Sequence, residues 1–129
     1  MLSPAMTTTD PATQERRLLD RLLGLYDEER RLYVEVLNLS RRQGEAIRGG
    51  APIGEIRRLL SRKKTCLETI GRLELTEGQN KSQWRQGRAN WSPAGRAQLH
   101  DALQDVGQLI ESILECEEAN DRALMELAR

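Results

Sequence analysis

A leucine-rich run, LLDRLLGLYDEERRLYVEVL (Leu18–Leu37), carries the strongest secondary-structure signal in this chain of 129 residues. Its apolar side chains recur three or four positions apart, which is the spacing of one face of an α-helix. The predicted helix covers residues 11–48. It begins at Asp10-Pro11, because an acidic N-cap followed by proline is a typical helix start. It ends at Gly49-Gly50-Ala51-Pro52, a typical stop and turn.

Two more helices are predicted, over residues 53–75 and 93–128. In the first, Lys63 interrupts a face on which the large apolar residues lie: Ile56, Leu59, Leu60, Leu67, Ile70 and Leu73. The second opens with Ser92-Pro93, and its apolar positions keep a three-four spacing as far as Leu127. Asn120 falls on this apolar seam, where a single polar residue commonly fixes register or oligomeric state.

These elements predict an all-α fold. The glycine turn makes an elongated antiparallel hairpin of the first two helices, and the long third helix packs against it as a three-helix bundle or coiled coil. Residues 76–92 contain no aliphatic residue larger than alanine and are predicted to form a loop or a loosely formed turn of helix. Residues 1–10 are predicted to be a disordered tail, and residues 11–129 a single helical domain.

The composition agrees with helices rather than a sheet. The chain has 20 leucines but only six isoleucines, three valines and no phenylalanine, whereas strands are enriched in β-branched and aromatic residues. No run approaches the roughly 18 consecutive apolar residues of a membrane-spanning helix. The first residues also lack the basic and then apolar regions of a secretory signal. A cytoplasmic protein without a membrane span is therefore expected.

Charge is balanced over the whole chain but not along it. Residues 41–96 hold 13 basic and five acidic side chains, whereas residues 97–129 hold two basic and eight acidic ones. The favoured interpretation is that the two regions attract one another within the fold. The alternative is that one of them faces a charged partner.

The residues typical of catalytic and metal sites are scarce. The one histidine, His100, lacks the Glu-x-x-His spacing of di-iron bundles, and the acidic residues of 111–121 lack the glycine-containing loop of a calcium site. No enzyme activity, cofactor or metal is predicted. Cys66 and Cys116 are expected to be buried free thiols, and whether they lie level depends on the path of residues 76–92.

The segment 76–92 carries both tryptophans, interleaved with basic residues. Trp84 and Trp91, together with Lys81, Arg85 and Arg88, could stack on and neutralise a nucleic-acid single strand. The favoured interpretation is that the two indole rings are buried and anchor the segment to the helices.

Two stretches resemble the flagellar export chaperones of the FlgN type. The first is the run Leu18–Leu37, followed by a glycine turn and then IRRLLSRKKTCLETIGRLE (Ile56–Glu74). Within it, Leu59, Leu60, Lys63, Lys64, Leu67 and Ile70 match the second helix of that family. The second stretch, LIESILECEEANDRALMEL (Leu109–Leu127), is similar to the family's last helix, whose asparagine and following leucine correspond to Asn120 and Leu124.

The resemblance implies a cytoplasmic chaperone that catalyses no reaction. Such a protein would bind amphipathic helical termini of hook-associated flagellar proteins, the subunits of the hook–filament junction, and pass them to the type III export apparatus. The expected partner-binding residues lie on the last helix: Leu109, Ile113, Cys116, Asn120, Leu124 and Leu127.

Two other functions remain open from the sequence. A self-associating coiled-coil structural or adaptor protein would use the same seam to bind a second copy. A nucleic-acid-binding helical module would use the basic middle of the chain, and is the less favoured of the two because the net charge is zero.

Overall fold

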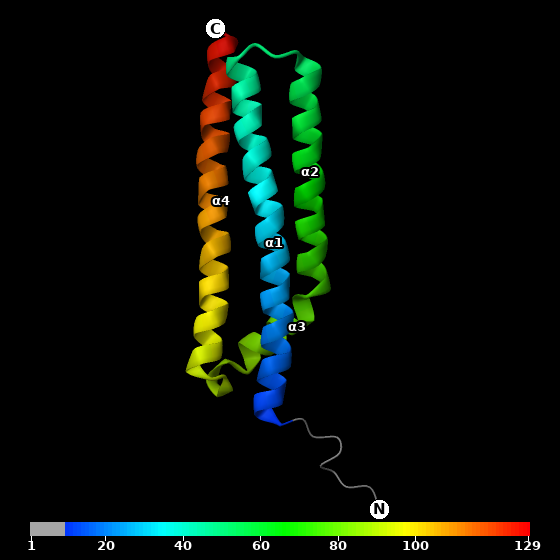
Figure 1. Cartoon of the computed structure of the whole chain (residues 1–129), viewed down its shortest axis with the longest axis vertical. Helices are drawn as coiled ribbons and strands as arrows, with labels where there is room; N and C mark the ends of the chain where they lie inside the picture. The colour runs from blue at the N-terminus through cyan, green and yellow to red at the C-terminus, as the bar shows by residue number, and fades with distance from the viewer. Residues whose placement is uncertain (1–9) are drawn as a thin grey trace, which may run out of the picture.

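The structure is a computed structural model that describes residues 10–129. It contains four α-helices, α1 (Pro11–Arg48), α2 (Ile53–Thr76), α3 (Gly78–Gln86) and α4 (Pro93–Leu127), and a short 3₁₀ helix (Arg88–Asn90) (Figure 1). No strand occurs among these residues, so the predicted all-α fold class is confirmed. Of the predicted tail, residues 1–10, all but Asp10 lies outside the described residues.

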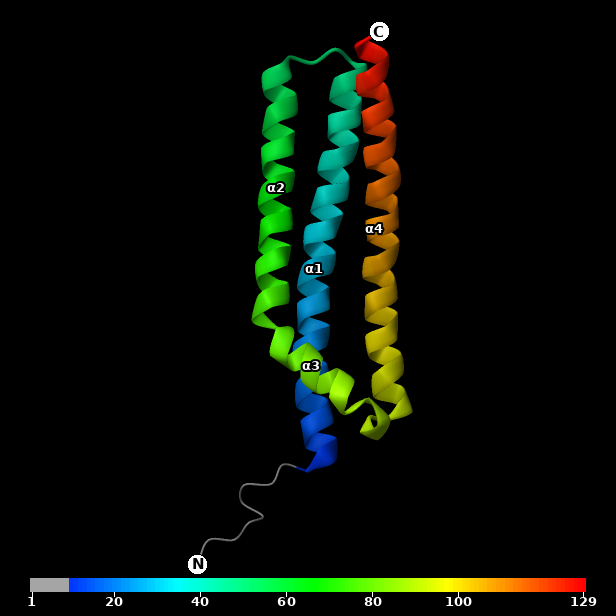
Figure 2. The same cartoon turned by 180° about the vertical axis from the view of Figure 1, so that it is seen from behind.

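The long helices lie side by side, with α1 between α2 and α4 (Figures 1 and 2). Helix α2 returns antiparallel to α1, and α4 runs parallel to α1, so the C-terminus lies at the end that carries the α1–α2 turn. Hydrogen bonds join Glu15 to Ser92 and Ser40 to Glu117, and both pairs are 77 residues apart in the chain. A constant separation at two levels means that α1 and α4 keep one register along their length.

The turn between α1 and α2 depends on glycine at one position. Gly50 has φ 71°, in the left-handed region that other residues rarely adopt. The backbone N–H of Ala51 donates to the carbonyl of Ala46 at 2.9 Å, and that of Gly49 donates to Glu45 at 2.8 Å. These bonds satisfy the last carbonyl groups of α1 and let the chain reverse within four residues.

Residues 76–92 were predicted to form a loop or a loosely formed turn of helix, and the loop interpretation is wrong in part, because α3 and the 3₁₀ helix occupy most of the segment. Figure 2 shows α3 crossing one side of α1. Trp84, the one buried residue of α3, packs into the core beside α1. A short helix held by one large ring has no repeating apolar pattern, and sequence periodicity therefore could not reveal it.

The core follows α1 from end to end. Near the N-terminus of α1, a large cluster combines its leucines with residues of α3 and α4; it contains Leu18, Leu19, Leu22, Leu25, Tyr26, Trp84, Trp91, Leu99 and Val106. In the middle, Val36 and Leu37 pack with Ile113. At the turn end, the cluster of Leu39, Ala46, Ile47, Ile56 and Leu59 joins α1 to α2. The stripe predicted on residues 11–48 thus supplies the buried centre of the fold.

The beginning of α4 is held by the beginning of α1. Ser92 is the N-cap of α4, and its Oγ accepts a hydrogen bond from the N–H of Gly95 at 3.0 Å. The same hydroxyl donates to Glu15 Oε2 at 2.7 Å, and the Ser92 N–H donates to the other carboxylate oxygen. The backbone and hydroxyl hydrogen bonds of Ser92 lower the pKa of Glu15. At the start of α1, in contrast, the Asp10 side chain makes no capping bond.

No helix among residues 10–129 combines the length and the apolar character needed to cross a lipid bilayer.

Candidate functional site

Asn120, the polar residue predicted on the α4 seam, is buried inside the chain. Its side chain is 1% exposed, and its Nδ2 donates a hydrogen bond to the backbone carbonyl of Ser40 at 2.8 Å. Its Oδ1 lies against Gly44, where a Cβ would come within 2.4 Å of that oxygen. Asn120 therefore joins α4 to α1 by a buried hydrogen bond and is not part of an exposed surface.

A polar cluster next to Asn120 brings all three long helices together. Lys63 of α2 donates from Nζ to Gln43 Oε1 of α1 at 2.6 Å and forms an ion pair with Glu117 of α4. Ser40 of α1 donates from Oγ to the same Glu117 carboxylate at 2.5 Å. Burial alone would raise the pKa of Glu117, but the hydrogen bonds from Lys63 and Ser40 hold it below its ordinary value. The Lys63–Glu117 pair thus links α2 to α4 across α1.

The other predicted partner-binding residues occupy different environments. Ile113 is in the core, and Leu109 and Cys116 are half-buried against the same cluster. Leu124 and Leu127 are 41% and 64% exposed. Because α1 and α4 pair 77 residues apart, Leu127 is level with Gly50, beyond the last residue of α1. The six residues therefore do not form one continuous exposed surface.

Three exposed leucines lie about one helical turn from a member of the Lys63–Glu117 ion pair. Leu60 and Leu67 lie three residues before and four residues after Lys63, so they flank it on the surface of α2. Leu114 lies three residues before Glu117 and flanks it in the same way on α4. The three side chains are 43%, 49% and 63% exposed. We call Leu60, Leu67 and Leu114 the leucine surface.

The spacing of apolar residues in α2 already indicated the leucine surface. Leu60 and Leu67 were expected on the same face as Ile56 and Leu59, but in the structure only the latter two are buried. Ile53, Leu60 and Leu67 recur every seven residues, which places them on a separate line of α2. Ile53 is also exposed, at 62%.

Both tryptophans are buried, as the anchoring interpretation predicted. Their rings stack with centroids 5.1 Å apart and an interplanar angle of 17°. The indole N–H of Trp91 donates to the carbonyl of Trp84 at 2.6 Å, which satisfies the only polar atom of that buried ring. Gly87 makes this packing possible, because a Cβ there would lie 2.4 Å from the Trp91 ring. The two ring faces that meet in the stack are not free to receive bases.

A second buried polar group lies on α1 where α3 crosses it. Glu29 is 1% exposed, and its Oε1 has no hydrogen-bond partner among the described residues. Burial raises the pKa of Glu29, although the charge of Lys81 acts in the opposite direction. Lys81 itself forms an ion pair with Glu74 and lies 5.5 Å from the centroid of the Tyr26 ring.

The remaining candidate groups for chemistry are dispersed. Within the described part of the chain, no three His, Cys, Asp or Glu side chains are grouped so that they could hold a metal ion. Cys66 and Cys116 are free thiols that pack against the Val36–Leu37–Ile113 cluster, and burial raises the pKa of Cys66. His100 is exposed on α4.

Comparisons of the chain with models of protein families, with curated proteins and with solved structures found no match.

Proposed function

We propose that this protein is a cytoplasmic chaperone of the FlgN type, which binds an amphipathic helix of a hook-associated flagellar protein and keeps it competent for export. On this proposal the three long helices form a stable bundle, and the partner helix adds its apolar face to the outside of that bundle. No reaction is catalysed.

The observation that supports the proposal is the leucine surface. The side chains of Leu60 and Leu67 on α2 and of Leu114 on α4 are exposed to solvent. The Lys63–Glu117 ion pair joins these two helices. A helix from a partner could bury all three side chains at once, because helical residues spaced by three, four and seven positions present one apolar stripe. Burying a leucine side chain contributes about 1.5–3 kcal/mol at full coverage, so three half-exposed leucines provide a substantial driving force.

The Lys63–Glu117 pair gives this surface a polar centre. Its charges are satisfied within the chain by Gln43 and Ser40, so covering them with a partner helix leaves no new unpaired charge. The acidic side chains that follow Glu117 on α4, such as Glu118 and Asp121, are exposed beside the surface. They favour a partner helix that carries basic residues at the edges of its apolar stripe.

The proposal is tested by capturing partners from the cells that make the protein, with wild type and three variants. Leu60→Asp and Leu114→Asp each place a carboxylate in the leucine surface. Leu75→Asp is the matched control, because Leu75 is also an exposed leucine of α2, at 84%, but lies on another line of that helix. All three changes are on the surface and are expected to leave the helical content unchanged.

The expected result is that wild type and Leu75→Asp recover hook-associated flagellar subunits and the two surface variants do not. Equal recovery of these subunits by wild type and all three variants would show that the leucine surface does not bind the partner. Recovery of the protein's own chain alone, at a native mass above that of a monomer, would favour the self-associating coiled coil and contradict the chaperone function.

A further inference from the structure

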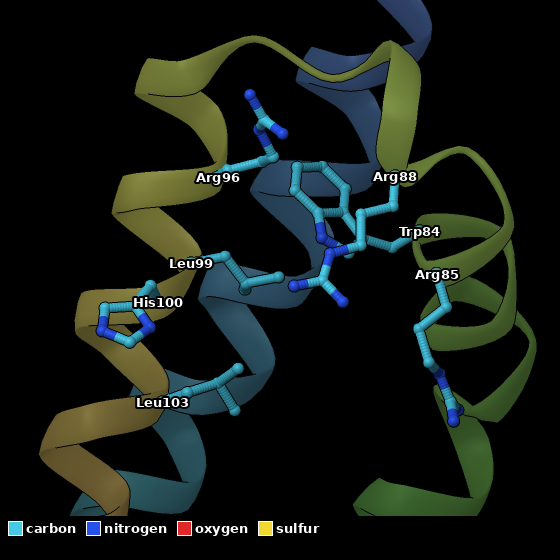
Figure 3. Close-up of a pocket in the computed structure, with 7 residues that line it drawn as sticks. All are labelled: Trp84, Arg85, Arg88, Arg96, Leu99, His100 and Leu103. Carbon is cyan, nitrogen blue, oxygen red and sulfur yellow. The ribbon is translucent and has the colours of Figure 1, made fainter.

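A pocket at the start of α4 combines a basic rim with an apolar floor. It has a volume of about 260 Å³ and lies between α4 and the segment that carries Trp84. Figure 3 shows Leu99 and Leu103 extending from α4 toward that segment and Arg88 reaching back toward α4. The other lining residues are Trp84, Arg85, Arg96 and His100.

The arginines of the rim have no acidic partner among residues 10–129. Arg85, Arg88 and Arg96 form none of the ion pairs of the described chain. Arg96 acts electrostatically on Glu15, whose carboxylate is already bound by Ser92. No acidic residue lines the pocket. Three arginines on the rim of one pocket therefore produce a positive potential that no residue of its lining neutralises.

The floor of the pocket is rigid and apolar. Trp84 is buried, stacked on Trp91 and fixed by the hydrogen bond between the Trp91 indole and the Trp84 carbonyl. Leu99 is buried in the same cluster, and Leu103 is 44% exposed beside it. A preformed floor of this kind favours a flat or branched apolar group, because little side-chain freedom is lost when the group binds.

We propose that this pocket binds a small anionic ligand whose phosphate or carboxylate lies against the Arg88 guanidinium, with Arg85 and Arg96 adding positive charge on either side of the rim, and whose apolar body rests on Trp84, Leu99 and Leu103. Arginine binds such oxyanions through paired N–H groups, which give both affinity and orientation. A nucleic-acid single strand fits less well, since it needs successive exposed aromatic faces along a groove, and the two tryptophans here stack on each other. The site is independent of the leucine surface.

The test uses phenyl phosphate as the probe, with inorganic phosphate for the charge alone and phenol for the apolar group alone. Binding is followed by two-dimensional ¹⁵N NMR of the full chain, in which the Trp84 indole N–H and the Leu99 and Leu103 amides report on the pocket. Phenyl phosphate is expected to shift these signals and to bind at least about tenfold more tightly than either fragment.

Arg88→Ala is expected to weaken binding of phenyl phosphate about tenfold, because it removes a charge-assisted hydrogen bond, and Arg96→Ala is expected to weaken it less, because Arg96 contributes only positive potential at the rim. Arg57→Ala is the matched control, since Arg57 is an exposed arginine of α2 that does not line the pocket. Inorganic phosphate binding as tightly as phenyl phosphate, or equal weakening by Arg57→Ala, would overturn the proposal. So would a single-stranded oligothymidine that shifts the pocket signals at lower concentrations than phenyl phosphate, which would assign the pocket to nucleic acid instead.

Discussion

The side-chain amide of Asn120 occupies the space that any side chain at Gly44 would need. A Cβ at position 44 would lie 2.4 Å from Asn120 Oδ1, well inside van der Waals contact. The amide cannot move aside freely, because it is buried and its Nδ2 is bonded to the Ser40 carbonyl. Gly44 therefore lets α1 and α4 approach closely at the level where the three long helices share their polar cluster.

Gly44→Ala is expected to lower the free energy of unfolding by about 1–2 kcal/mol, because overpacking at this contact outweighs the better helix propensity of alanine. Gly24→Ala is the matched control on the same helix. Nothing lies within 4 Å of a Cβ at Gly24, so alanine there is expected to stabilise the protein by up to about 1 kcal/mol. Urea denaturation measures both changes.

A double variant separates the contact from other effects of Gly44→Ala. In an Asn120→Ala background the oxygen that opposes the new Cβ is absent, so Gly44→Ala is expected to cost much less than it does in wild type. An equal cost in both backgrounds would show that Asn120 is not the reason for glycine at position 44.

Glu29→Met is expected to raise the free energy of unfolding at pH 7 by about 1–3 kcal/mol, because it removes a buried carboxylate that has an unpaired oxygen. The pKa of Glu29 is raised in the folded chain above its ordinary value of 4.5, chiefly by burial. The folded state therefore holds this proton more tightly than the unfolded state, and wild type loses stability as the pH rises from about 4.5 through the folded pKa.

The advantage of Glu29→Met should accordingly shrink when the pH falls below about 4.5, where Glu29 is protonated in both states. Urea titrations at pH 4 and pH 7 measure it. A gain of equal size at the two pH values would mean that the charge of Glu29 is not what destabilises wild type.

Lys63→Met is expected to destabilise the protein by about 1–3 kcal/mol at pH 7, because it leaves the Glu117 carboxylate with Ser40 alone. The effect is smaller than for a fully buried pair because the Glu117 side chain is one-third exposed. Lys64→Met is the matched control. Lys64 is exposed and pairs only with Glu68, at 3.9 Å, so its loss should change stability by less than about 0.5 kcal/mol.

The pH dependence of Lys63→Met distinguishes a charge effect from a packing effect. In wild type the pKa of Glu117 is lowered by the fold, so its contribution is present above the unfolded pKa and is lost as the pH falls through the folded pKa. This loss in acid should be smaller in Lys63→Met. The same acid profile in both proteins would contradict the assigned role of the ion pair.

Leu22→Asp is expected to destabilise the protein by about 4 kcal/mol or more, because Leu22 is 1% exposed in the largest core cluster and a carboxylate there has no partner. Leu124→Asp is expected to cost less than about 1 kcal/mol, since Leu124 is partly in solvent near the end of α4. Thermal unfolding followed by circular dichroism compares the two. Equal losses of melting temperature would show that Leu124 belongs to the core.

The three long helices could be predicted because their determinants are local. The apolar spacing of Leu18–Leu37, the glycines before α2 and the Ser92 cap each act within a few residues of the backbone they shape. The structure places the helices at Pro11–Arg48, Ile53–Thr76 and Pro93–Leu127, within one residue of the predicted ends. Helix α3 was predicted only as a loop or a loose turn of helix, because its stability rests on Trp84 packing against distant residues of α1 and α4.

The candidate sites could be predicted less well than the helices. Lys63 was recognised as an interruption of the apolar face of α2. Its partner Glu117 is 54 residues away on α4, and apolar spacing does not specify the register of α4 against α2. Leu60 and Leu67 were expected on the buried face but are exposed, whereas Ile113 and Asn120 were expected on a binding surface but are buried. The width of an apolar stripe does not reveal how much of it a neighbouring helix covers. The pocket beside Trp84 likewise depends on how α3 lies against α4.

Local sequence is enough to define where the long helices begin and end and which side of α1 is apolar, because helix propensity, capping and periodicity are properties of neighbouring residues. Three features depend on tertiary packing: the register of α4 against α1 at a separation of 77 residues, the fit of Asn120 against Gly44, and the ion pair between Lys63 and Glu117. These choices depend on the shapes of helix surfaces that come together from distant parts of the chain. Close packing selects one such arrangement, and it leaves some leucines of α2 and α4 exposed.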